Sequence, residues 1–296
     1  ILMLITLIVA PIIILIKVFA SPVSLSQAFA AAGPGFGSLT GGLTGFAAGL
    51  MIFNNLAWFF GYLGGQPQLN ARFMGMKDEK NVRSGRNIAV VWTIIAYSGV
   101  VIIGLGAQVL YGPKAVADTE MILPFLLNNM FPGWLAALLL AGAVAAMIST
   151  AESMLLVAAT SISEDVYKGI LKKGKAKDRT LLLISRVATV AVGVLGLILA
   201  LTTKDLIYSI VSYAWAGIGC SFAPAVLLSF YWDRFNAAGV VTALATGLVS
   251  TVVWMLAGLE KTVTARASTF VIAMGLAVLV TLLSKKTEPQ PAARIP

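Results

Sequence analysis

Histidine is absent from the 296 residues of the chain, and cysteine occurs only once, at Cys220. The lack of histidine excludes zinc sites built on imidazole and catalytic triads that use a histidine base. A single thiol cannot form a disulfide within the chain, so we interpret Cys220 as a packing residue. Charged residues are also scarce, at 11% of the chain against roughly 25% in soluble domains. These shortages argue against a soluble globular protein.

Long apolar stretches dominate the rest of the sequence. Hydrophobic residues make up 59% of the chain, and the mean hydropathy is +0.93. A helix needs about 20 apolar residues to cross the ~30 Å hydrocarbon core of a bilayer. Eight stretches are long enough: 1–20, 42–64, 88–111, 134–160, 180–202, 206–231, 237–258 and 267–284. We therefore predict an all-α integral membrane protein in which residues 1–296 form one transmembrane helical bundle.

Basic residues, which give the chain a net charge of +9, alternate between the predicted loops. Loop 65–87 carries five Lys and Arg residues and loop 161–179 carries six, whereas loop 21–41 carries none. Lys and Arg gather in the cytoplasmic loops of membrane proteins. Loops 65–87 and 161–179 and the C-terminus are therefore predicted to be cytoplasmic, in a multi-pass protein of the plasma membrane. This explanation of the charge requires no nucleic-acid partner.

Glycine and proline cluster in one predicted span, in the stretch WFFGYLGGQPQLNARF from Trp58 to Phe73. Such clusters in a membrane helix are typical of unwinding over a cavity or against other helices. Freed backbone groups and aromatic faces can bind a small polar solute there, and the candidate residues are Trp58, Tyr62, Gln66 and Pro67. The alternative is a plain helix end, because Gly-Gly followed by Pro commonly stops a helix before a loop. The pattern alone leaves both interpretations open.

Hydroxyl groups interrupt another apolar stretch, AAMISTAESMLLVAAT from Ala145 to Thr160. On a helix, four residues near the middle of the predicted span 134–160 share one face: Ala146, Ser149, Thr150 and Ser153. Adjacent hydroxyls and a backbone carbonyl one turn earlier can supply part of the oxygen shell that a small hard cation such as sodium needs. The alternative is structural, because Ser and Thr often bond the carbonyl four residues earlier or let helices approach closely.

Glu152 lies beside these hydroxyls, roughly 60° around the helix from Ser149. An ionised side chain at the centre of a membrane helix costs roughly 2.5–3.5 kcal/mol, and no charged partner lies deep in another predicted span. Three explanations remain open: the carboxyl is protonated, it lies in a hydrated cavity, or it meets a cation. Glu152 and Ser153 therefore form a candidate second cation or proton site.

Three long stretches carry a resemblance that extends over nearly the whole chain. They are GYLGGQPQLNARFM (61–74), AAMISTAESMLLVAATSISEDVYKGILKK (145–173) and VSYAWAGIGCSFAPAVLLSFYW (211–232). In this order they resemble the sodium/solute symporter family, most closely its sodium/proline symporters. The resemblance implies thirteen spans in an inverted-repeat, leucine-transporter-like fold. The eight predicted spans then look like the last eight, and we expect that an N-terminal part is missing from this sequence.

The resemblance also implies site residues. The helix similar to 134–160 contributes to a sodium site in that family, and the matching ligands are the Ala146 carbonyl and the Ser149 and Thr150 hydroxyls. The segment similar to 42–67 is a broken helix whose substrate side corresponds to Trp58, Tyr62, Gln66 and Pro67. The chain departs from the family at Gly64-Gly65, where one glycine usually precedes Gln-Pro. Either the aromatic residues or the Gln-Pro pair is therefore shifted by one position.

The function implied by this resemblance is sodium-coupled uptake of a small organic solute, with proline or a similar amino or carboxylic acid as the expected solute. Pantothenate, monocarboxylates and sugars are alternative solutes of similar scaffolds. A symporter-like membrane sensor is a rival function, and an intramembrane enzyme is disfavoured because Glu152 has no titratable partner in the predicted spans. The expected partners are sodium, the solute and the bilayer. We expect no cofactor and no obligate protein partner.

Overall fold

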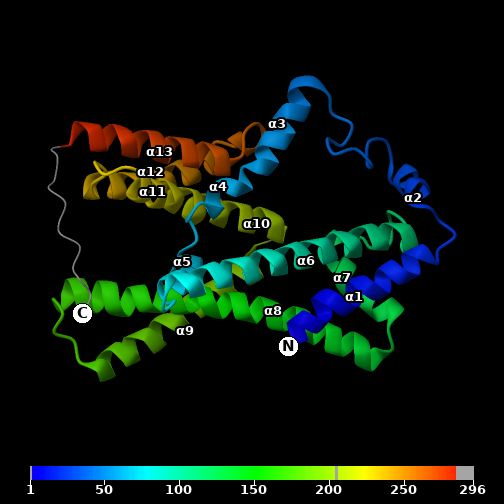
Figure 1. Ribbon diagram of the computed structural model, residues 1–296, viewed down its shortest axis with the longest axis horizontal. Coiled ribbons are helices and arrows are strands. Elements are labelled where there is room, and N and C mark those ends of the chain that lie inside the picture. The colour runs from blue at the N-terminus through cyan, green and yellow to red at the C-terminus, as the bar shows by residue number, and fades with distance from the viewer. Residues whose placement is uncertain (1, 204–205, 285–296) are drawn as a thin grey trace. The chain divides into compact units, whose positions relative to one another are not determined.

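Helices make up the regular secondary structure of the described residues. The computed structural model describes residues 2–203 and 206–284, and no strand occurs within these ranges. The backbone contacts divide the chain into two compact units (Figure 1). Unit 1 comprises Ile1–Leu43 and Phe73–Thr203, and unit 2 comprises Thr44–Arg72 and Lys204–Pro296. Each unit contains helices long enough to cross a bilayer.

Eight helical runs among the described residues are long and apolar enough to cross a membrane. They are Leu2–Phe19, Gly45–Met74, Glu79–Tyr111, Gly133–Leu171, Asp178–Thr202, Ile207–Tyr231, Ala237–Leu256 and Ala265–Leu283. Many of their large apolar side chains are exposed, among them Ile94, Val194 and Leu256, as expected of helices that face lipid. The predicted all-α, multi-span architecture is confirmed, while the assignment of one domain to residues 1–296 stays a prediction.

Two helices continue into polar sequence beyond the predicted spans. The fourth run passes Thr160 and continues as a π-helical segment, Ser161–Leu171, within the loop predicted at 161–179. The third run begins at Glu79, within predicted loop 65–87, and the Asp78 carboxylate caps it by accepting from the Asn81 N–H at 2.7 Å. Hydropathy marks where a helix leaves lipid, whereas capping groups decide where it ends. Both predicted loops are therefore shorter in the structure.

Helix α1 (Leu2–Phe19) of unit 1 packs against both α6 and α8 (Figure 1). The other elements of the unit are α2 (Leu25–Ala32), α6 (Glu79–Tyr111), η1 (Thr119–Met121), α7 (Ile122–Met130), α8 (Gly133–Thr160), η2 (Ser161–Leu171) and α9 (Asp178–Thr202). Fully buried Ala10, Leu127 and Leu139 pack together. The Thr6 hydroxyl donates to the Leu139 carbonyl at 2.8 Å, which adds a polar contact between α1 and α8.

Glycines allow α1 to approach its neighbours. A Cβ atom at Gly106 of α6 would collide with Cγ2 of the fully buried Ile14, and one at Gly142 of α8 would collide with the Thr6 hydroxyl. Lipid tails are as apolar as leucine, so membrane helices associate through close packing at small residues rather than through the hydrophobic effect. Both interfaces of α1 therefore require a glycine on the neighbouring helix, because any side chain there would collide with α1.

Three helices of unit 2 pack against one another: α11 (Cys220–Tyr231), α12 (Ala237–Leu256) and α13 (Ala265–Leu283) (Figure 1). The other elements are α3 (Gly45–Leu56), α4 (Trp58–Tyr62), α5 (Pro67–Met74), α10 (Ile207–Ala214), η3 (Trp215–Gly219) and η4 (Leu259–Lys261). Buried Ala225, Ala243 and Ala277 lie in the contact between these three helices. The Thr251 and Thr269 hydroxyls lie 2.7 Å apart and link α12 to α13 by a buried hydrogen bond.

Substituting Gly106 with alanine tests the role of close packing in unit 1. Gly106→Ala is expected to lower stability by about 1–3 kcal/mol, because the added methyl group overpacks the interface at Ile14. Gly104→Ala is the matched control on the same helix, since a Cβ there has no neighbour within 4 Å. The apparent melting temperature of the purified protein in detergent measures both changes. Equal melting temperatures for the two variants would contradict the packing of α1 on α6.

Candidate functional site

The helix predicted over 42–64 is interrupted within unit 2. Helix α4 ends at Tyr62, the next four residues are not helical, and α5 begins at Pro67 and continues to Met74. Gly64 has a φ of 86°, a left-handed conformation that favours glycine. Pro67 suits the first position of the new helix, because its missing N–H is not needed there. The Gly-Gly-Gln-Pro sequence is thus an interruption inside the run Gly45–Met74 rather than its end.

Side chains and local turns provide hydrogen-bond partners for some of the backbone N–H and C=O groups that lose their helical bonds at the interruption. The Asn70 amide donates to the Gly64 carbonyl at 2.7 Å, and the Gly64 N–H donates to the Tyr62 carbonyl at the same distance. The Gln66 side chain is buried, and its carbonyl oxygen accepts from the Gln68 amide at 3.0 Å. These bonds hold the non-helical segment in one conformation, as buried backbone in a membrane requires.

Both glycines at the departure from the family pattern have a structural role. Gly64 provides the left-handed φ, and Gly65 lies so close to the Gly219 carbonyl that a Cβ atom would collide with it. Gly219 is the last residue of η3, a π-helical turn, so two irregular segments meet here. Such turns are frequent at functional sites. The sequence signal for this contact was the doubled glycine, but nothing in the sequence pointed to Gly219 as its partner.

Four aromatic side chains gather around the interruption, and we call them the aromatic cluster: Trp58, Tyr62, Tyr208 and Trp215. The Trp58 indole donates to the Tyr208 hydroxyl at 3.2 Å, and the Trp215 indole donates to the Trp58 carbonyl at 3.0 Å. The Tyr62 and Trp215 rings meet edge to face, with centroids 4.5 Å apart. The cluster joins α4 to α10 and η3, and its partly exposed rings can contact the apolar part of a small solute.

The predicted solute residues fall into two environments. Trp58 and Tyr62 belong to the aromatic cluster, and Tyr62 is 52% exposed. Gln66 is buried, with its amide nitrogen beside Gly219. Pro67 begins α5 and is partly buried. The structure thus places all four residues at the interruption or directly beside it.

Arg266, Tyr208 and Trp215 are neighbours of this site that sequence reasoning missed. Arg266 is only 4% exposed, and its guanidinium lies 4.2 Å from the centre of a Trp58 ring. The predicted span 267–284 leaves Arg266 just outside the helix, whereas α13 begins at Ala265. A basic residue next to an apolar run normally faces water or headgroups. The sequence therefore contains no signal that Arg266 is buried.

The predicted sodium residues lie on α8 in unit 1. The Thr150 hydroxyl donates to the Ala146 carbonyl at 3.2 Å, and the Ser153 hydroxyl donates to the Ser149 carbonyl at 2.9 Å. Bonding to the carbonyl four residues earlier, the structural alternative, therefore occurs at Thr150 and Ser153. It also brings a hydroxyl and a carbonyl oxygen together on one face, and the hydroxyl oxygen keeps lone pairs that a cation can use. Ser149 and Thr150 are both exposed.

Ala146 and Glu152 have different surroundings. Ala146 lines a cavity of about 240 Å³ between α1, α6, α7 and α8, whose wall is almost wholly apolar. Glu152 is exposed. Among the described residues, no group of three or more His, Cys, Asp and Glu side chains is placed to hold a metal ion.

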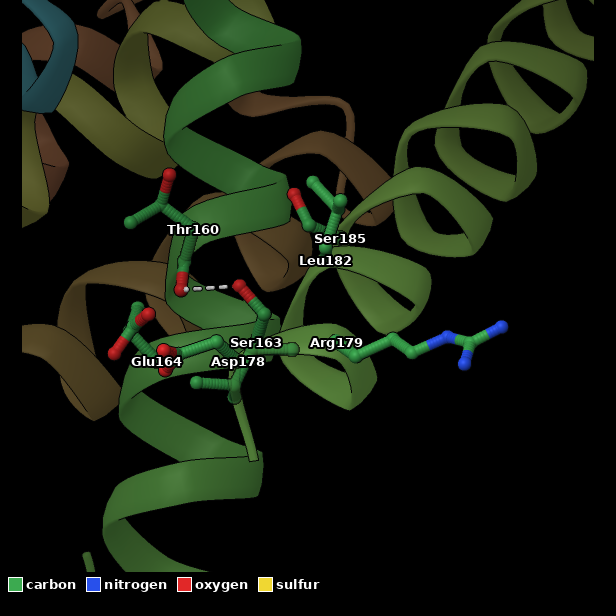
Figure 2. A pocket seen from close by; sticks show the side chains of 8 residues that line it. Thr160, Ser163, Glu164, Asp178, Arg179, Leu182 and Ser185 are labelled. Atoms are coloured by element: carbon green, nitrogen blue, oxygen red, sulfur yellow. Dashed lines mark hydrogen bonds between the residues drawn. The ribbon is translucent and has the colours of Figure 1, made fainter. Parts of the chain in front are cut away.

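A second cavity of unit 1, about 580 Å³, lies where α8 passes into η2 and α9 begins (Figure 2). It is lined by Thr160, Ser163, Glu164, Asp178, Arg179, Leu181, Leu182 and Ser185. Figure 2 shows the Arg179 side chain extending away from the others. The Ser163 hydroxyl donates to the Thr160 carbonyl at 3.4 Å, and Glu164 pairs with Lys168 at 2.7 Å. The cavity is a recess with both polar and apolar lining groups, at the end of the helix that carries the predicted sodium residues.

Comparison with known proteins identifies the family. The sequence profile of the Sodium:solute symporter family matches residues 1–247. The chain belongs to the sodium:solute symporter family. This is a family of transporters, so the chain is not an enzyme, in agreement with the sequence prediction.

Curated relatives in this symporter family are described as proline transporters. The chain is 36% identical to the osmoregulated proline transporter OpuE of Bacillus subtilis (strain 168) over 245 residues, which cover 81% of this chain and 49% of OpuE. It is 36% identical to the high-affinity proline transporter PutP of the same organism over 213 residues, 71% of this chain and 45% of PutP. It is 32% identical to the sodium/proline symporter of Escherichia coli (strain K12) over 209 residues, 69% of this chain and 41% of the relative. The chain thus spans about half the length of the curated relatives it matches.

Substituting Gly65 with alanine tests the contact between the interruption and η3. Gly65→Ala is expected to lower stability by about 1–3 kcal/mol, because the new methyl group meets a backbone carbonyl that cannot rotate away. Gly275→Ala in α13 is the control, since a Cβ there has no neighbour within 4 Å. Thermal unfolding in detergent measures the difference. If Gly65→Ala melts at the same temperature as Gly275→Ala, the close approach to Gly219 is wrong.

Proposed function

We propose that the whole protein takes up a small organic solute by coupling its entry to the inward movement of sodium. The observation that carries this proposal is the interruption between Tyr62 and Pro67, in a chain that belongs to the sodium:solute symporter family. Interrupted membrane helices commonly form substrate and ion sites in secondary transporters, because they expose backbone groups at mid-depth. The proposed solute is proline or a similar amino or carboxylic acid, by analogy with the proline transporters to which the chain is similar.

In this proposal the solute binds at the interruption, and Trp58, Tyr62, Gln66 and Pro67 form its site in unit 2. The partly exposed rings of Trp58 and Tyr62 contact the apolar part of the solute. Backbone groups between Leu63 and Gln66 and the Gln66 amide contact its polar part. The hydrogen bonds and glycine contacts of this segment hold these groups in place before the solute arrives, which favours binding.

Sodium binds, in this proposal, to the face of α8 that carries the Ala146 carbonyl and the Ser149 and Thr150 hydroxyls. The Thr150 hydroxyl and the Ala146 carbonyl oxygen are 3.2 Å apart. Two oxygens at this separation can share one ion with cation–oxygen distances of about 2.4 Å, as in calcium sites. Other segments supply the remaining oxygens. Glu152 and Ser153 form a second candidate site for a cation or a proton on the same turn of the helix.

Coupling follows from a difference in affinity between two conformations. Sodium and solute drive transport only if each binds one conformation more tightly than the other, because a ligand that binds both equally shifts nothing. We propose an inverted-repeat, leucine-transporter-like fold in the plasma membrane for the complete protein. The predicted cytoplasmic side carries loops 65–87 and 161–179 and the C-terminus.

Replacing the hydroxyls of α8 tests the sodium site. Ser149→Ala and Thr150→Ala are each expected to raise the sodium concentration for half-maximal uptake by roughly tenfold, the effect of losing about 1.4 kcal/mol of ion binding. Thr189→Ala is the control, because its hydroxyl also bonds the carbonyl four residues earlier but lies on α9. Uptake of labelled proline, pantothenate, a monocarboxylate and a sugar into vesicles with a sodium gradient provides the measurement. Unchanged sodium dependence in both variants would reject the site.

Cysteine labelling tests the orientation. Cys220 is fully buried, and Cys220→Ala removes the one thiol of this sequence. In that background we expect Ser38→Cys to react with a membrane-impermeant maleimide in intact cells. Lys173→Cys should react only after the membrane is permeabilised, because it lies in a strongly basic loop. Both positions are exposed, so the difference reports the side of the membrane. The reverse pattern would overturn the proposed orientation.

A further inference from the structure

Arg266 carries a buried charge that forms no ion pair with an acidic side chain of the described residues. The residue lies in the first turn of α13 and is 4% exposed. The ion pairs of Arg83 with Glu79 and of Lys168 with Glu164 do not involve Arg266. The neighbouring Glu260 carboxylate instead accepts from the Thr264 hydroxyl at 3.0 Å and from the Ala265 N–H at 2.6 Å.

This position is unfavourable for a cation on two grounds. The N-terminal end of a helix carries a partial positive charge, which repels a guanidinium in its first turn. Burial of a charge without an opposite charge is also costly, and replacing buried ionic groups by apolar ones is often neutral or stabilising. The Arg266 Nε–H, moreover, is buried without a hydrogen-bond partner in the described part of the chain. Fold stability alone therefore does not account for arginine at this position.

The contacts that Arg266 does make converge on Trp58. One terminal nitrogen donates to the Ser212 hydroxyl of α10, and the other donates to the Asn54 carbonyl of α3 at 3.2 Å. Between these two anchors the guanidinium lies over a Trp58 ring, with its central carbon 4.2 Å from the ring centroid. A desolvated guanidinium over an indole face is a strong form of cation–π contact. The two hydrogen bonds thus hold the cation against one face of the indole.

Asn54 is itself fixed from both sides. Its amide donates to the Thr262 carbonyl at 3.1 Å, and its side-chain oxygen accepts from the Thr264 N–H at 3.0 Å. The anchor of Arg266 on α3 is therefore tied to the start of α13, the helix that carries Arg266. The Trp58 indole N–H is held by the Tyr208 hydroxyl at the same time. Its ring is thus restrained at one face by a cation and at one edge by a hydrogen bond.

We propose that Arg266 is a positioning residue that holds the Trp58 indole in the orientation required for solute binding. This inference rests on the proposed function, in which Trp58 contacts the solute. Lysine cannot replace arginine here, because a single ammonium group lacks the planar fork that reaches two acceptors while lying flat on a ring. The role predicts an effect on solute affinity that is larger than the effect on folding.

Three variants of the full-length protein test this role. Arg266→Met removes the charge and the hydrogen bonds, and Arg266→Lys keeps the charge but not the fork. Arg234→Lys is the matched control, because the Arg234 guanidinium also donates to a backbone carbonyl. Its acceptor is Leu282, at 2.9 Å, which lies at the opposite end of α13 from Arg266. Each variant is assayed for sodium-dependent uptake of labelled proline, or of the solute identified by the panel above, and for its melting temperature.

We expect Arg266→Met and Arg266→Lys to raise the KM for solute by roughly five- to tenfold, the effect of losing about 1–1.4 kcal/mol of solute binding when the indole is no longer held in place. The maximal rate per molecule, the sodium concentration for half-maximal uptake and the melting temperature should change little. Arg234→Lys should leave the KM unchanged. A second test combines Arg266→Met with Trp58→Phe. If the arginine acts through the indole, the double variant should have nearly the KM of Trp58→Phe alone.

Two results would overturn the inference while leaving the proposed function intact. The first is a lower melting temperature with an unchanged KM in both Arg266 variants, which would make the residue a structural clamp only. The second is a double variant whose KM is raised by the product of the single effects, which would show that Arg266 and Trp58 act independently. Absence of sodium-dependent uptake by the unaltered protein with every solute tested would instead overturn the proposed function and, with it, this inference.

Discussion

The requirement that backbone polar groups find partners inside the protein governs this structure, because a bilayer offers no water to hydrogen-bond them. Most of the chain meets this requirement with helices. The exception is the segment between Tyr62 and Pro67, where the helical bonds are lost. The Asn70 amide and the buried packing against Gly219 stabilise that segment, so the interruption is a specific structure rather than a frayed helix end. A non-helical segment stabilised in this way suits the proposed solute site.

Small residues serve both units in different ways. In unit 1, Gly106 and Gly142 let helices approach α1 and keep regular backbone. In unit 2, Gly64 and Gly65 allow an irregular backbone to form and to press against another irregular turn. The first use is the general rule for helix packing in lipid. The second is local to the candidate site.

Charged residues are scarce in the described spans. Two of them, Glu152 and Arg266, differ in their burial. Glu152 of α8 is exposed within its unit, whereas Arg266 is buried and held between hydroxyl, carbonyl and aromatic partners. Sequence reasoning singled out Glu152 because it stands in the middle of an apolar run. It passed over Arg266, because a basic residue at the edge of such a run is ordinary.

The sequence by itself determined the number and approximate positions of the apolar helices and the oxygen-bearing face of α8, because bilayer thickness and helical periodicity act on contiguous residues. It also contained the signal of an irregularity at Gly64-Gly65, but it left open whether the helix ended or resumed there. Only the tertiary structure decided that question, because the answer depends on Asn70 folding back and on Gly219 arriving from a distant part of the chain. The burial of Arg266 against Trp58 was decided in the same way, by contacts between segments far apart in sequence.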